Sequence, residues 1–157
     1  MKTSYSLLVA LFALFATMTA SAQQPWKVGD YYDVDGKQGV VFIVTPDGKH
    51  GKIVCLRDLG SFSWDAAKSK CAQLGTGWYL PSIGEVEGMY KAMSEINPTL
   101  LAVGDPLVDN FYWSSTENGS DGALGVDMYD GATRFDYKYD GDFFESGYHY
   151  VRAVSAF

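Results

Sequence analysis

The chain has 157 residues, of which 15% are aromatic, and its 19 acidic residues outnumber its 12 basic residues to give a formal net charge of −7. Nucleic acids and anionic membrane surfaces select basic patches, so this charge argues against both as partners. The length fits one domain with a hydrophobic core of its own.

Residues 1–22 have the pattern of a secretory signal peptide. A basic start at Lys2 is followed by an uncharged apolar run over residues 7–18, and Ala20-Ser21-Ala22 is a small-residue cleavage signal. The run is too short to cross a bilayer, which takes roughly 20 apolar residues, and no later stretch is apolar enough for insertion in a membrane. We therefore expect a single domain over residues 23–157, exported to the periplasm, the cell surface or the medium.

A β-hairpin is predicted over about residues 37–58. Residues 39–44 form a continuous β-branched and aromatic run that is too short for a helix, which is typical of a strand buried on both faces. Pro46-Asp47-Gly48 is a turn signal, and residues 52–56 are the predicted returning strand.

The first helix is predicted to begin after Ser63, whose hydroxyl is expected to cap it. Its buried face follows from the helical spacing of Trp64, Ala67, Cys71 and Leu74. The glycines at positions 75 and 77 are expected to end it.

The second helix is predicted to begin with a capping box, in which the side chains of Ser82 and Glu85 each bond the amide of the other residue. Asn97-Pro98 is expected to end it. The link between the helices is predicted to be extended, as is usual before a proline, and we expect Trp78 and Leu80 in it to be core residues.

Short strand-like pieces separated by Asp-Gly turns fill the C-terminal third, which is typical of antiparallel hairpins. The order of strands, two helices and strands predicts an α+β domain with a mostly antiparallel twisted sheet. The predicted strands are 111–115, 123–129, 132–137 and 148–154.

The two cysteines, Cys55 and Cys71, are predicted to form a disulfide, because an even number of cysteines in an exported chain favours a bridge. The bridge would close a loop of about 16 residues and stabilise the fold by on the order of 3 kcal/mol. The alternative is two buried thiols.

Several of these segments together resemble the DUF1566 family, also called the Lcl C-terminal domain family, over roughly residues 60–157. The resemblance implies a C-type-lectin-like fold in a secreted or surface protein of bacteria, and an adhesin of the family is associated with sulfated glycans. The similar segments are Trp64-Asp65-Ala66-Ala67, Cys71-Ala72-Gln73-Leu74, Gly77-Trp78-Tyr79-Leu80-Pro81-Ser82 with Glu85, Tyr112-Trp113-Ser114-Ser115-Thr116-Glu117 and Val151-Arg152-Ala153-Val154.

Two departures from the family pattern matter. The family usually has a cysteine at the position of Ala153, as a natural partner for the helix cysteine, so Cys55 is the expected substitute partner here. A sulfated-glycan site needs a basic surface, and the acidic charge of this chain argues against that ligand.

No catalytic motif is found, because the sequence lacks a nucleophile elbow, a P-loop and a dinucleotide fingerprint and singles out no carboxylate pair. Zinc is not expected from His50 and His149, which are far apart in the sequence. Calcium, which binds six to eight oxygens, is the alternative to plain turn chemistry for the acidic residues after Trp113. Arg152 is predicted to be structural and paired with a carboxylate such as Glu85 or Asp127.

The sequence therefore predicts a secreted or cell-surface, non-catalytic domain that binds a glycan or a surface protein without a cofactor. The alternatives are a structural subunit of a surface complex and, less favoured, a glycan-acting hydrolase. The binding side chains are expected in the loops after Trp113 and around Asp140, namely Trp113, Glu117, Asn118, Asp121, Asp140 and Asp142.

Overall fold

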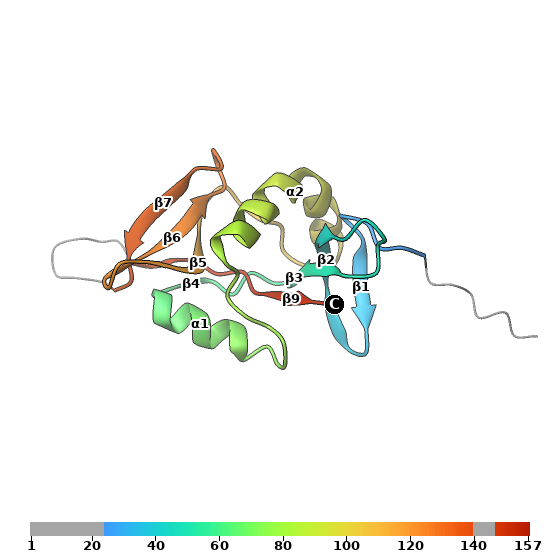
Figure 1. Cartoon of the computed structure of the whole chain (residues 1–157), viewed down its shortest axis with the longest axis horizontal. Coiled ribbons are helices and arrows are strands. Elements are labelled where there is room, and N and C mark those ends of the chain that lie inside the picture. Colours follow the sequence, from blue (N-terminus) through green and yellow to red (C-terminus); the bar gives the residue numbers. More distant parts are fainter. Residues whose placement is uncertain (1–23, 140–146) are drawn as a thin grey trace, which may run out of the picture.

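Two β-sheets packed with two helices make up the computed structural model, which describes residues 24–139 and 147–157 (Figure 1). The expected signal peptide and the predicted ligand residues Asp140 and Asp142 lie outside the described residues. Within the described part of the chain, no helix is both long and apolar enough to cross a membrane. The elements are β1 (Tyr31–Val34), β2 (Lys37–Val44), β3 (Gly51–Val54), β4 (Ser61–Phe62), α1 (Trp64–Ala72), α2 (Ile83–Val103), β5 (Phe111–Asn118), β6 (Gly122–Asp127), β7 (Thr133–Tyr137), β8 (His149–Tyr150) and β9 (Val154–Ala156).

The first sheet has the strand order β1-β2-β3-β9 and contains the predicted hairpin, which is confirmed. β2 and β3 pair in antiparallel register, with an irregularity between Val41 and Ile43. β1 extends the sheet on one side, and β9 extends it on the other, where Val154 pairs with Val54. The N-terminal hairpin and the end of the chain therefore form one sheet.

The second sheet has the order β4-β8-β5-β6-β7 and is antiparallel except where β5 runs parallel to β8. Successive residues of a strand point to opposite faces. Accordingly, Tyr112 of β5 packs into the apolar cluster that includes α2, and Trp113 packs into the cluster that includes α1. The two helices thus lie on opposite sides of these strands (Figure 1).

α2 is longer than predicted, because Pro98 lies inside the helix instead of ending it. Ile96 and Leu100 are one turn apart and fully buried in the core cluster. The burial of this face continues past the proline, and we attribute the tolerated loss of one backbone hydrogen bond to that packing. The capping box between Ser82 and Glu85 is confirmed, with both reciprocal bonds present.

α1 is shorter than predicted and ends at Ala72, before the glycines at positions 75 and 77. Trp64 and Cys71 are buried as expected, but Leu74 lies beyond the helix, where helical spacing no longer sets its direction, and it is 43% exposed. Ser63 occupies the N-cap position, yet its side chain makes no capping hydrogen bond.

The prediction of one last strand over residues 148–154 is wrong. β8 belongs to the second sheet and β9 to the first, and the buried residues 151–153 carry the chain from one to the other. The last segment of the chain therefore contributes one strand to each sheet. The expected α+β architecture is confirmed, with two helices on mostly antiparallel sheets and an N-terminal hairpin.

Candidate functional site

Trp113, a predicted ligand residue, is instead a core residue. Its side chain is fully buried, and its indole Nε1 donates to the carbonyl of Phe62 over 2.9 Å. The ring packs edge-on against Phe111 and His149. The prediction failed because strand alternation places position 113 on the face covered by α1, where a surface ligand has no access.

Glu117, Asn118 and Asp121, three further predicted ligand residues, are exposed together at the tip of the β5–β6 hairpin. Lys138, just after β7, holds this tip in place. Its Nζ binds Oε2 of Glu117 at 2.6 Å and donates to the carbonyl of Ser120 at 3.0 Å. The structure therefore brings these three residues together, but it commits the Glu117 carboxylate to an ion pair.

Lys138 also packs on the ring of Trp64 from α1. Its Nζ lies 4.6 Å from the ring centroid, and the Nζ of Lys68 lies 3.6 Å from the same centroid. The Lys138 side chain is 10% exposed. Its hydrogen bond, and next its charge, hold the pKa of Glu117 below the ordinary value. The hairpin tip is thus tied to α1 through one lysine.

β7 is the terminal strand of the second sheet among the described residues, and one of its faces is aromatic. Phe135 and Tyr137 are two residues apart, so they point to the same face. Their rings meet edge-on with centroids 5.3 Å apart, and the side chains are 45% and 42% exposed. Phe135 lies directly over Gly122 of β6, where a Cβ would collide with the ring.

We call this aromatic pair together with the hairpin tip the β7 surface. It is defined by Glu117, Asn118, Asp121, Phe135 and Tyr137. The aromatic pair supplies apolar area, and Asn118, which is in register with Gly122 and Tyr137, supplies an amide group on the same face, whereas Glu117 is in register with Ala123 and Asp136 on the opposite face. Such a surface can pack on another molecule, but it presents no arrangement that would move a proton or bind a phosphate.

The opposite face of β7 carries paired polar side chains. Asp136 contacts Nε2 of His149. Arg134 binds Asp127 at 3.4 Å and Asp130 at 2.5 Å. These groups satisfy one another.

The described residues form no metal site. No three of their acidic, histidine or cysteine side chains are grouped so that they could hold an ion. His50 precedes β3 in the first sheet, whereas His149 lies in β8 of the second. Calcium binding stays a prediction, because Asp140 and Asp142 lie outside the described residues.

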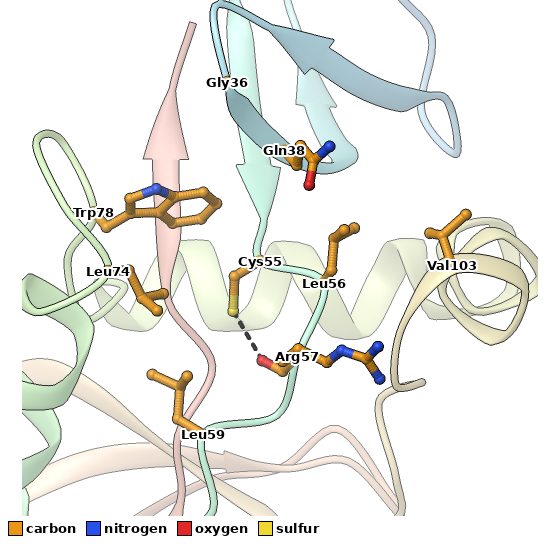
Figure 2. A pocket seen from close by; sticks show the side chains of 9 residues that line it. All are labelled: Gly36, Gln38, Cys55, Leu56, Arg57, Leu59, Leu74, Trp78 and Val103. Atoms are coloured by element: carbon orange, nitrogen blue, oxygen red, sulfur yellow. Dashed lines mark hydrogen bonds between the residues drawn. The ribbon is translucent and has the colours of Figure 1, made fainter.

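A separate concave site is a pocket of about 430 Å³ beside the segment that follows β3 (Figure 2). Trp78 and Leu74 stand on one side of it and Gln38 on another (Figure 2). Small-molecule sites typically have volumes of about 300–1,000 Å³ and mostly apolar walls with a few polar groups. The lining residues are Gly36, Gln38, Cys55, Leu56, Arg57, Leu59, Leu74, Trp78 and Val103, of which five are apolar and none is a carboxylate.

The polar groups of the pocket keep unused hydrogen-bonding capacity. Gln38 donates from Nε2 to Asp33 at 2.9 Å, which leaves its Oε1 as an acceptor. Arg57 binds Asp105 at 3.2 Å through one guanidinium nitrogen and is 70% exposed. No described residue accepts a hydrogen bond from the indole Nε1 of Trp78.

Arg152 lies behind the pocket floor, and its predicted pairing is wrong. Its guanidinium bonds the carbonyls of Cys55, at 3.4 Å, and Asp105, not the carboxylates of Glu85 or Asp127. It is 1% exposed, and its Nε has no partner among the described residues. Burial raises the pKa of the Cys55 thiol, and the charge of Arg152 opposes part of that rise. A buried cation without a carboxylate partner therefore sits next to the pocket.

The predicted disulfide is not formed, because Cys55 and Cys71 are both free and buried. They belong to the same apolar cluster, but the Sγ of Cys55 donates to the carbonyl of Arg57 at 3.0 Å. Burial raises the pKa of Cys71 to about 12. The structure thus has the alternative arrangement of two protonated, buried thiols.

The link before α2 positions Trp78 through a network centred on Glu85. Its Oε1 accepts from the Tyr79 hydroxyl at 2.7 Å and pairs with Lys52 at 3.0 Å, while Oε2 closes the capping box with Ser82. Burial acts to raise the pKa of Glu85, but these hydrogen bonds and Lys52 lower it below 4.5. Trp78 is partly buried, packs against two core clusters as expected and also lines the pocket, whereas Leu80 is buried.

Sequence reasoning missed the pocket. Gln38 comes from β2, Arg57 from the link after β3 and Val103 from the end of α2, and no local pattern relates them. The close approach of Gly104 to the carbonyl of Leu56, which brings the end of α2 to the pocket, arises only in the fold.

Comparison with known proteins does not assign a family, since no family model and no curated protein matches the chain. Solved structures with some likeness include the complex of a von Willebrand factor A1 domain mutant with botrocetin, at 10% identity and a TM-score of 0.42, covering 80% of this chain and 95% of that chain. Botrocetin itself is 13% identical with a TM-score of 0.40, and the match covers 82% of this chain and 95% of botrocetin. The Yersinia pseudotuberculosis adhesin InvE is 17% identical with a TM-score of 0.41, and the match covers 83% of this chain and 34% of InvE. Likenesses at this level carry no argument about ligands or partners.

Proposed function

We propose that this chain is an exported, non-catalytic binding domain that recognises a glycan or a surface protein through the β7 surface. The observation that carries the proposal is the exposed, touching pair of Phe135 and Tyr137 beside the polar hairpin tip. Aromatic side chains are enriched at recognition surfaces, because they combine a large apolar area with few rotamers. The export part of the proposal is supported by the pattern of residues 1–22.

Further exposed aromatic side chains in this part of the sequence support the proposal. Tyr129 follows β6, Tyr139 follows β7 and Tyr148 precedes β8, and each is more than half exposed. A soluble domain gains nothing for its own core from rings left in water. Their concentration between residues 129 and 148 is therefore better explained by contact with another molecule.

A hydrolase has less support. Glycoside hydrolysis needs two carboxyl groups held about 5 to 10 Å apart across a cleft. Among the described residues, no carboxylate lines the pocket. At the β7 surface, Glu117 is paired with Lys138. A structural subunit of a surface complex is the second candidate, because an aromatic sheet face also suits a permanent protein contact.

The proposal is tested with the chain from residue 23 on a glycan array, with and without calcium, and on whole cells of the producing species. Periodate treatment of the cells removes glycan ligands, and protease treatment removes protein ligands. We expect binding that one of the two treatments abolishes. A calcium requirement would support the predicted ion site.

The variant Phe135→Ser removes the aromatic pair, and Tyr31→Ser removes a ring of similar exposure on β1 of the other sheet. We expect binding to fall by at least about tenfold in the first variant and to be unchanged in the second. Absence of binding to the array and to cells, or an equal loss in both variants, would contradict the proposal.

A further inference from the structure

We infer that the pocket beside Trp78 binds a small amphipathic carboxylate, that is, a molecule with an apolar ring or chain and one anionic end. The pocket shares no residue with the β7 surface. The inference therefore goes beyond the proposed function and does not rest on it.

The apolar part of the ligand follows from the walls. Leu59, Leu74 and Trp78 present their side chains to one concave space (Figure 2). Leu74 is 43% exposed there, so part of its apolar surface is in water in the free protein. A sugar would need a partner for each hydroxyl that it buried. The lining exposes apolar side chains and polar groups in similar shares, which suits an amphipathic ligand with an apolar body and a polar end.

The anionic end follows from the charges. Arg57 is the only charged side chain among the described residues of the lining, and Asp105 uses only one of its guanidinium nitrogens. The remaining donors of a guanidinium form a planar fork that fits a carboxylate. The buried Arg152 adds a second positive charge behind Cys55, and no carboxylate of the described residues is bonded to it. The described lining therefore offers guanidinium donors that the ion pair with Asp105 leaves unused, and these donors can bind an anionic group.

The volume of the pocket and its remaining hydrogen-bond donors narrow the class of ligand further. A volume of about 430 Å³ lies in the lower part of the range for small-molecule sites and suits a single ring with a short acid chain. Trp78 adds an indole N–H that no described residue uses. A second oxygen of the ligand can accept from it.

The test uses 3-phenylpropionate as a probe and the neutral 3-phenylpropanamide as its matched control. The probe is titrated into ¹⁵N-labelled protein while the indole N–H signals are followed, with the Trp78 signal assigned by its absence in Trp78→Phe. We expect a saturable shift of the Trp78 signal with the carboxylate. The amide should bind at least about tenfold more weakly, because it lacks the charge-assisted bonds.

Variants on the exposed rim keep the fold and test the site. Arg57→Gln should weaken the carboxylate by about tenfold and bring it close to the amide. Leu74→Asp should abolish the shift, whereas Leu101→Asp, at a 68% exposed position of α2 outside the pocket, should leave it unchanged. The inference is overturned if no saturable shift occurs, if acid and amide bind equally, or if the shift survives Leu74→Asp. Phe135→Ser should not affect it, and a loss there would also count against a separate site.

Discussion

The pocket beside Trp78 draws its lining from four stretches of the chain that are far apart in sequence, whereas the β7 surface comes from the end of β5, the turn after it and β7, all within three consecutive strands. The pocket exists because β2, the link after β3, the link before α2 and the end of α2 meet. The β7 surface exists as soon as β5, β6 and β7 pair. A change deep in the core should therefore damage the pocket first, and a change in the hairpin should damage only the β7 surface.

The largest effect is expected from Arg152→Ala. The change removes the bonds to the carbonyls of Cys55 and Asp105 and leaves a cavity at the crossing between the sheets. We expect a loss of about 3 kcal/mol or more in urea unfolding. Amide exchange should rise more at residues 55–57 than at residues 133–137.

Arg152→Met is the matched control for that change, because it keeps much of the volume without a charge. Its loss should be smaller, since a buried cation without a carboxylate partner is itself costly. Unchanged stability of Arg152→Ala, or faster exchange in β7 than in the pocket floor, would break the proposed contrast between the two regions.

Glu85→Gln should have the next largest effect, on the order of 2 kcal/mol, because Glu85 joins the capping box to Tyr79 and Lys52. The folded state lowers the pKa of Glu85 below 4.5. Its stabilisation is therefore complete above pH 4.5 and is lost as the pH falls through the lower pKa of the folded state. The acid limb of a stability-against-pH curve should be shallower in Glu85→Gln. Parallel curves for the two proteins would contradict the assigned network.

Lys138→Met should cost less stability and act on one region. It frees Glu117 and the carbonyl of Ser120, so amide exchange at residues 117–121 should rise. The affinity for 3-phenylpropionate should stay the same. A changed affinity of the pocket for 3-phenylpropionate in this variant would show that the two regions are coupled. Lys68→Met, which keeps the hairpin contacts of Lys138, is the control.

Leu74→Asp and Phe135→Ser should have the smallest effects on stability, on the order of 1 kcal/mol each, because both side chains are only about half buried. Each should nevertheless remove the binding of its own region and leave the other intact. Thermal unfolding measured together with both binding assays checks this. A loss of both activities in either variant would mean that the pocket and the β7 surface are not independent.

Local signals predicted the local structure well. The capping box at Ser82 and Glu85 and the hairpin around Pro46-Asp47-Gly48 appear as expected, because short-range hydrogen bonds and turn geometry need no distant partner. Predictions of which face of an element is buried, and of which distant side chains pair, were less accurate. Trp113 is buried where a ligand residue was expected, and Trp78 packs against the core as expected but also lines a pocket that was not predicted.

The errors have a common physical origin. Pro98 remains within α2, a length we attribute to packing against the sheets, and the last strand divides because two sheets compete for it. Arg152 takes its bonds from two carbonyls at that division, where a sequence pattern suggested a carboxylate. Cys55 and Cys71 share a cluster, yet the thiol of Cys55 is directed to a carbonyl.

Composition, periodicity and turn chemistry by themselves determined the α+β class, the hairpin, the existence of both helices and the position of the hairpin tip, since these depend on interactions within a few residues. The tertiary structure decided which face of each element is covered. It therefore decided that the aromatic face of β7 is exposed, that Trp113 is not, and that Gln38, Arg57, Leu74 and Trp78 meet around one pocket. Contacts between distant segments leave no periodic trace in a single sequence, and only the fold shows them.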